Sequence, residues 1–448
     1  MMQSKLLLRD VIDQFVEVRA KTMDLFTPLS VEDAVIQSSN FGSPPNWHIA
    51  HVTWFFHKIL EKYNGKVDLK NNFNLDYLNS YYQKYGKILT KSERGRYPRP
   101  TVTQSIKYRE DIETIFIEFL NSLDEIKLSE KFVLDVMTAI NHEFQHQELM
   151  VYDFQHYFNR FKDDMDCYYP TRRSKSPSTI EYVKREMIEI PGGIYTLGYS
   201  GKDFCYDNEL PENKVFLNPY SIDNCLVTNG DFMRFMEDGG YENYKFWLAD
   251  GWDLVVNEDW HCPLYWYFDE EKNNWFKKDF CGRNEINLNE PVLNISYFEA
   301  DAYAKWANKR LPTEAEWEKA AAWDEDKQVK SVYPWGDQIP TKDHANLFES
   351  YIWRPTIAGS FPLGKSHYGC YQMIGDVWEW TSSEYVLYPG FKSRFEEYTD
   401  KWAINQKVLR GGCYVTSVKQ IRNSYRNYYK PHERIVFAGF RCVTDSHC

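Results

Sequence analysis

The sequence predicts two domains, an N-terminal four-helix bundle followed by a mixed α+β domain, on three observations. The 448 residues exceed what one hydrophobic core usually organises. The first 160 or so residues carry apolar positions spaced by three and four, which is typical of amphipathic helices. Beyond them, turn-bounded short segments dominate. We expect the domains at 1–165 and 187–448, with a charged, turn-rich linker at 166–186.

Four long helices are expected in the first domain. The apolar positions of the first helix include Leu7, Val11, Phe15 and Val18. The second begins at Ser43-Pro44, a capping residue followed by proline in the first turn. The third fits 102–123, and the fourth fits 130–157, which contains no glycine or proline. Four such helices indicate a bundle.

The remaining segments are less regular. Residues 65–100 are polar and tyrosine-rich, and long loops in compact domains are often functional. The second domain begins near Met187 with a short strand and a glycine turn. Capping boxes at Ser296–Glu299 and Thr313–Glu316 predict two of its helices.

Charge and cysteine usage limit the classes of partner. The formal net charge of -12 argues against binding to nucleic acid or an anionic membrane, so the expected partners are small molecules. Nine cysteines without a C-x-x-C pair fit thiols in a reducing compartment. The N-terminal run of three leucines is too short for a signal peptide or a membrane span, so we expect a cytoplasmic protein. The oligomeric state is not defined by the sequence.

A metal site is predicted in the stretch NHEFQHQELMVYDFQH. His142 and His146 lie four residues apart on the fourth helix, so they share one face about one turn apart. The segment WHIAHVTWFFH offers His48, His51 or His57 as a third ligand from another helix. Spacing alone leaves these three open.

A carboxylate is the rival third ligand, since two histidines and one carboxylate hold iron in many oxygenases. Glu143 and Glu148 point away from the histidine pair at about 100° per residue. His156 lies about 21 Å along the helix from His142, too far to share an ion. Three histidines with an open position suit zinc as well as iron, so spacing does not choose the metal.

The segment H142-E-F-Q-H146-Q-E148 resembles the H-x-x-x-H-x-E signature of the hercynine oxygenases, the sulfoxide synthases of ergothioneine biosynthesis. SPPNWHIAHVTWFF resembles the other ligand helix of that family and selects His51 over His48 and His57. The resemblance extends through RYPRPTV, RLPTEAEWE, IGDVWEWTSSEY, VLRGGCY, SYRNYYKPHER and AGFRC. It implies a DinB-like four-helix bundle followed by a formylglycine-generating-enzyme-like domain of C-type-lectin-like fold.

The resemblance implies an Fe(II) enzyme that uses O2 to join the sulfur of cysteine or γ-glutamylcysteine to the imidazole of hercynine as a sulfoxide. His51, His142 and His146 would hold the iron. Selenoneine synthases and histidine-using ovothiol enzymes share this architecture and remain alternatives. A zinc-dependent thiol transferase of the DinB type and a non-enzymatic lectin-like module are rivals from other classes.

The same resemblance implies roles for residues around the metal. Gln145, Asn427 and Tyr428 would contact hercynine, whose trimethylammonium group suits a cation–π contact. Tyr81 and Tyr82 resemble an active-site tyrosine pair in which a phenol near the iron can hydrogen-bond or donate a proton.

The sulfur donor is the other ligand to place. Arg94, Arg96 or Arg99 suits its carboxylate, because guanidinium binds carboxylates in a bidentate manner. Some members that use γ-glutamylcysteine carry aspartate where this chain has Tyr429, which favours free cysteine. Tyr388 and Tyr398 are further pocket candidates without an assigned role.

The formylglycine-generating enzymes bind copper through a cysteine pair shortly after the R-G-G segment. Here Cys413 lies within that segment, and the next cysteine is Cys442. We therefore expect the second domain to supply a pocket wall and not copper chemistry.

Overall fold

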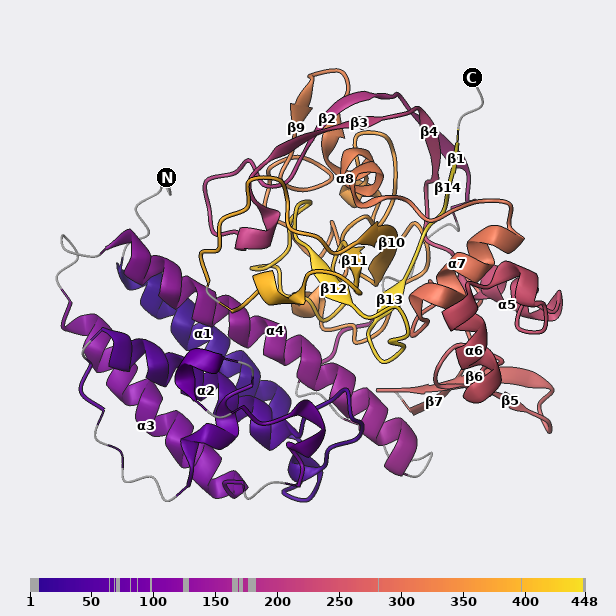
Figure 1. Cartoon of the computed structure of the whole chain (residues 1–448). Helices are drawn as coiled ribbons and strands as arrows, with labels where there is room; N and C mark the ends of the chain where they lie inside the picture. Colours follow the sequence, from indigo (N-terminus) through magenta and orange to yellow (C-terminus); the bar gives the residue numbers. More distant parts are fainter. Residues whose placement is uncertain are drawn as a thin grey trace. The chain divides into compact units, whose positions relative to one another are not determined.

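In the computed structural model the chain divides into two compact units (Figure 1). The first comprises Met1–Thr171, Lys202–Phe204 and Phe395–Tyr398, and the second comprises the rest. The structure describes residues 8–63, 65–67, 69, 73–80, 82–86, 88–96, 99–123, 129–162, 168, 172–175, 183–280, 282–395 and 397–445. Much of the expected linker at 166–186 therefore lies outside the described residues.

The first unit contains the predicted four-helix bundle. Its helices are α1 (Leu8–Phe26), α2 (Pro45–Lys62), α3 (Val102–Asn121) and α4 (Glu130–Phe161). In Figure 1 the four helices lie alongside one another, and α2 packs against both α3 and α4. Because α2 is buried over most of its surface, its three histidines, His48, His51 and His57, face the protein interior.

Two details of the predicted helices are wrong. Ser43 does not cap α2: the N-cap is Pro44, and Pro45 takes the first helical position, where a missing N–H costs no hydrogen bond. The Ser43 hydroxyl instead accepts a hydrogen bond from Arg94 at 2.8 Å. The α4 helix continues to Phe161, beyond the expected end at 157, because no glycine or proline stops it there.

The described parts of the segment 65–100 are short turns packed on the bundle. Three 3-10 turns occur, at Leu75–Leu78, Gln83–Tyr85 and Lys91–Glu93. The Leu75–Leu78 turn packs against α2, and the side chains of Tyr77 and Leu78 are buried. This packing places backbone carbonyl groups of the turn beside the helix.

The second unit has the mixed α+β architecture predicted for it. Its helices are α5 (Asn229–Glu237), α6 (Ala249–Asn257), α7 (Tyr297–Trp306) and α8 (Glu314–Ala322). Its strands are β1 (Met187–Ile190), β2 (Gly193–Leu197), β3 (Asn213–Leu217), β4 (Tyr220–Asp223), β5 (Trp266–Asp269), β6 (Asn274–Asp279), β7 (Gly282–Glu285), β8 (Trp323–Asp324), β9 (Val329–Lys330), β10 (Trp378–Glu384), β11 (Lys407–Arg410), β12 (Asn427–Tyr429), β13 (Ala438–Gly439) and β14 (Val443–Asp445). The expected strand at Met187 and both expected capping boxes, on α7 and α8, are confirmed.

Small sheets organise this unit. The largest has the strand order β12-β11-β10-β13, and a second has the order β1-β4-β14. The β10–β13 pair is parallel and joins Trp378 to Ala438. A buried cluster of charges lies beside these strands, in which Arg410 contacts Glu314 and Glu318, and Arg426 contacts Glu314. These buried ion pairs join segments that are far apart in the sequence, among them α8 and β11.

Within the described ranges, no helix is long and apolar enough to cross a membrane.

Candidate metal centre

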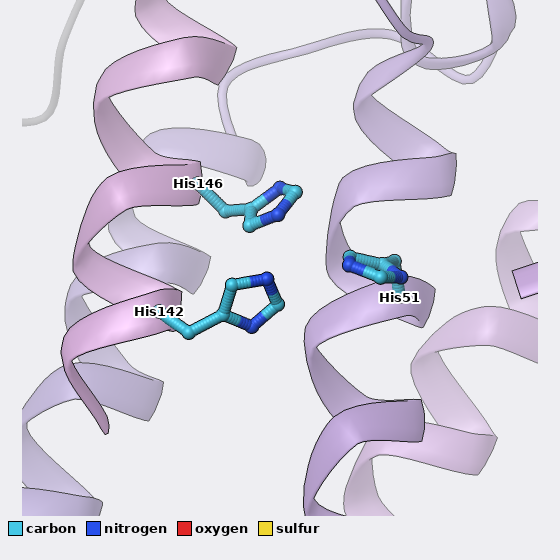
Figure 2. A group of neighbouring side chains, drawn as sticks. All are labelled: His51, His142 and His146. Carbon is cyan, nitrogen blue, oxygen red and sulfur yellow. The ribbon is translucent and has the colours of Figure 1, made fainter. Parts of the chain in front are cut away.

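Three histidine side chains converge inside the first unit. His142 and His146 project from α4 toward His51 on α2, and Figure 2 shows the three rings directed at one another. Each ring offers one nitrogen, and these nitrogens all lie within 4.8 Å of one another. Of the three candidates on α2, the structure therefore brings His51 into the cluster.

The His51 ring is held in one orientation from several sides. Its Nδ1 lies 2.6 Å from the Leu78 carbonyl oxygen, which can only accept a hydrogen bond, so Nδ1 carries the proton. The Trp47 ring stacks on it with centroids 4.4 Å apart, and Trp54 stacks at 5.8 Å. The Nε2 atom is buried without a hydrogen-bond partner. A lone pair held in this way is suited to a metal ion.

The two histidines of α4 are held differently. His142 packs against Phe55, with ring centroids 4.6 Å apart, and its Nδ1 is buried without a hydrogen-bond partner. His146 is half-buried, and its Nδ1 lies 2.7 Å from Nδ1 of His48. The Nε2 atom of His146 is therefore the nitrogen left for a ligand.

The site keeps these imidazoles neutral. Burial lowers the pKa of His142 to about 3, against a smaller opposing effect of the Glu143 charge. Burial also lowers the pKa of His51 and His146 well below the usual range, and the neighbouring histidines lower it further. Neutral imidazole is the form that binds metals, so all three rings are ready to donate a lone pair at neutral pH.

Nearby carboxylates do not join the cluster. Glu143 is fully buried on another face of α4, where its two oxygens bind Arg19, Arg109 and Thr22. Glu148 accepts a hydrogen bond from Tyr152. Among the described residues, the metal-ligand cluster consists of the three histidines alone. This donor set fits a metal ion with positions left open for other ligands, and iron and zinc both accept it.

Of the predicted tyrosine pair, Tyr81 lies outside the described residues. Tyr82 is buried, and its ring packs against Trp54 at 6.1 Å and Phe55 at 5.9 Å. These two rings in turn contact His51 and His142. Tyr82 therefore contacts the histidines through the rings of Trp54 and Phe55, and its catalytic role stays a prediction.

Gln145 lies beside the cluster, next to His146 on α4. Its side-chain oxygen accepts a hydrogen bond from Tyr398, which belongs to the first unit. The Tyr398 ring also packs against His142, with centroids 5.7 Å apart. Tyr398 was a pocket candidate without a role in the sequence, and its contact to Gln145 could not be deduced from spacing.

The predicted arginines occupy different settings. Arg94 is buried, and its guanidinium carbon lies 3.7 Å from the centre of the Trp47 ring, which itself stacks on His51. Arg96 is exposed and lines a surface hollow of about 530 Å³ with Arg160 at the end of α4. Arg94 thus contacts the site through Trp47, and binding of a substrate carboxylate by either residue stays a prediction.

Asn427 and Tyr428 lie in the second unit on β12. The Tyr428 ring stacks on Tyr385 with centroids 3.9 Å apart, and both predicted residues are half-buried. Their contact with hercynine stays a prediction. In the same unit, Cys413 and Cys442 are buried.

Next to the cluster lie two further polar residues: His48, one of the three candidate third ligands on α2, and Asp153, which was not predicted as a site residue. His48 contacts His146, and its other ring nitrogen lies 3.0 Å from Asp153. The spacing carried a usable signal: His48 is three residues before His51, and Asp153 is seven residues after His146. Both separations place the side chains on one helix face.

These features define a class of protein, a helical bundle with a cluster of three histidines suited to a metal ion, joined to an α+β domain. Residues 14–152 match the DinB superfamily, and residues 173–446 match the sulfatase-modifying factor enzyme 1-like domain. The matches agree with the fold class that the sequence predicted.

Comparison with individual proteins identifies the family within this class. Hercynine oxygenase of Mycolicibacterium smegmatis is 32% identical over 364 residues, 80% of this chain and 81% of that one. Hercynine oxygenase of Mycobacterium tuberculosis is 39% identical over 241 residues, 53% of this chain and 56% of the relative, so this match spans just over half of its length. Formylglycine-generating enzyme of Mus musculus is 27% identical over 58% of this chain. The chain belongs to the hercynine oxygenase family.

Proposed function

We propose that this chain is an Fe(II)- and O2-dependent sulfoxide synthase that joins hercynine to cysteine in ergothioneine biosynthesis. The observation that carries the proposal is the three-histidine cluster in a member of the hercynine oxygenase family. His51, His142 and His146 would hold the iron. A cytoplasmic location also stays a prediction.

The electron count supports this reaction without a further cosubstrate. Hercynine loses a C–H hydrogen, the thiol loses its S–H hydrogen, and a carbon–sulfur bond forms, which releases two electrons. Oxidation of the sulfur to a sulfoxide releases two more, so one O2 is reduced to the sulfoxide oxygen and one water. When bound, Fe(II) supplies the redox chemistry that O2 needs and a positive charge that favours thiol deprotonation.

The residues of the chain would bind and orient the substrates. Gln145, which lies next to His146 and accepts a hydrogen bond from Tyr398, would position hercynine beside the cluster. Asn427 and Tyr428 are proposed as further hercynine contacts. Tyr82, one ring away from His51 and His142, and its neighbour Tyr81 are proposed as hydrogen-bond or proton donors.

Cysteine is the proposed sulfur donor, because Tyr429 stands where family members that use γ-glutamylcysteine carry aspartate. Arg94 and Arg96 are the proposed partners of its carboxylate. Arg96 is exposed, while Arg94 is already engaged with Ser43 and Trp47, so Arg96 is freer to bind an added ligand.

Oxygen uptake by the Fe(II)-loaded chain tests the proposal. We expect hercynine-dependent uptake with cysteine and a product containing both substrates plus one oxygen. Faster uptake with γ-glutamylcysteine would correct the donor, and uptake only with histidine or a selenium donor would indicate the ovothiol-type or selenoneine-type alternative. Tight zinc binding with thiol transfer and no oxygen uptake would contradict an oxygenase and favour the DinB-type transferase.

A further inference from the structure

Two more buried side chains, His48 and Asp153, extend from His146 into the bundle. His48 on α2 places Nδ1 at 2.7 Å from Nδ1 of His146 and Nε2 at 3.0 Å from Oδ2 of Asp153. His48 is 3% exposed and Asp153 is 5% exposed. The proposed function uses neither residue, although buried polar groups of this kind are costly unless they are fully paired.

The contacts of Asp153 fix the direction of these hydrogen bonds. Its Oδ2 also accepts the backbone N–H of Ser43 at 3.0 Å, so this oxygen acts as an acceptor. His48 must then donate through Nε2–H. A neutral His48 has no proton left for Nδ1, which can only accept, so His146 must donate through its own Nδ1–H.

We propose that His48 is a positioning residue that, together with Asp153, fixes His146 in the tautomer whose Nε2 lone pair faces the metal. The inference rests on the metal site of the proposed function and adds a residue pair to it. Carboxylate–histidine–metal arrangements commonly orient a ligand in this way. Here an extra imidazole stands between the carboxylate and the ligand.

The ligand on α2, His51, is oriented in the same way, but its acceptor is a backbone carbonyl group. His51 donates through Nδ1–H to the Leu78 carbonyl, which leaves its Nε2 without a hydrogen-bond partner. Thus an acceptor faces Nδ1 of both His51 and His146. The acceptor for His146 is a side chain, so it can be removed by substitution.

The backbone near the start of α2 is shaped to receive Asp153. A Cβ atom at Gly42 would lie 1.9 Å from Oδ1 of Asp153, so only glycine leaves room for this carboxylate. The adjacent Ser43 is held in turn by Arg94. The turn at Gly42 and Ser43 therefore holds the Asp153 carboxylate through contacts that do not involve the histidine cluster.

The test measures the affinity of the full chain for Co(II), by competition with a chromogenic chelator. His48→Leu removes the acceptor and should weaken Co(II) binding by about 10–100-fold. His48→Asn places an amide oxygen where Nδ1 stood and should recover most of the affinity. His57→Leu is the matched control, since His57 is buried on the same helix but its Nδ1 faces the Tyr108 hydroxyl at 2.9 Å.

The outcomes separate this inference from the proposed function. Equal losses in His48→Leu and His57→Leu, or a His48→Asn variant as weak as His48→Leu, would assign the effect to packing and overturn the inference. Absence of Co(II) binding by the unaltered chain would overturn both proposals. The expected affinity series without hercynine-dependent oxygen uptake would support the inference and contradict only the proposed reaction.

Discussion

Two adjacent residues of α4, His142 and Glu143, are both buried but have opposite surroundings. Glu143 has both oxygens paired, and although burial alone would raise its pKa, Arg109 and Arg19 hold that pKa at about 2. His142 has a buried nitrogen without a hydrogen-bond partner and faces two other imidazoles. Glu143 therefore carries a paired charge that stabilises the bundle, whereas His142 carries a lone pair that can bind a metal ion.

The largest expected effect comes from replacing His142, the proposed metal ligand of the two residues. His142→Ala should abolish turnover and metal binding, because one of three nitrogen donors is lost, while the fold persists since the buried nitrogen makes no hydrogen bond. Oxygen uptake, metal content and thermal unfolding of the metal-free chain measure this. Full turnover by the variant would contradict the ligand assignment.

Glu143 should behave in the opposite way. Glu143→Ala leaves Arg19 and Arg109 buried without their carboxylate, so the helical unit should lose about 3–5 kcal/mol of unfolding free energy. Denaturant unfolding measures the loss, and Glu143→Gln should lose less because an amide oxygen can still accept one hydrogen bond. If the folded fraction of Glu143→Gln loses its metal while His142→Ala keeps it, the roles of the two residues are reversed.

The sequence predicts the histidine pair of α4 better than it predicts the partners of Glu143. The spacing of His142 and His146 places both on one helix face whatever the rest of the fold does. The partners of Glu143 come from α1 and α3, at Arg19 and Arg109, and no local pattern links residues so distant in sequence. The third ligand needed the family resemblance, because His48, His51 and His57 were equivalent by spacing.

The same limit applies to the two units. Helices such as α3 repeat their apolar positions every three to four residues, so the expected 102–123 lies close to the observed Val102–Asn121. The sheets of the second unit join distant residues, as where β10 pairs with β13 across Trp378 and Ala438. Strand order therefore depends on tertiary packing, which single-residue patterns do not encode.

His156 offers a smaller test, as a buried histidine on α4 outside the cluster. Burial lowers its pKa to about 4, with Asp153 opposing and Arg160 adding to the shift. Between pH 6.5 and 4 the unfolded chain binds a proton that the folded chain does not, so stability falls as the pH falls.

The unfolding free energy of the helical unit should therefore drop between pH 7 and 4.5 by about 2 kcal/mol more in the unaltered chain than in His156→Gln. Denaturant unfolding at the two pH values measures the difference. The other buried histidines contribute equally to both chains and cancel. Parallel pH profiles, or a loss of Co(II) affinity in His156→Gln, would contradict this separation from the metal site.

The smallest expected effect comes from Gly42, which touches no ligand. Its backbone does not require glycine for a positive φ, so Gly42→Ala acts mainly by pushing the Asp153 carboxylate away from a Cβ that would lie 1.9 Å from it. Because the carboxylate is the flexible end of its side chain, the unfolding free energy should change little. Co(II) affinity should fall by about tenfold, since His48 loses the acceptor that fixes its own tautomer. An unchanged affinity would show that His146 is oriented without Asp153, whereas equal losses of affinity and stability would indicate general disruption of the turn.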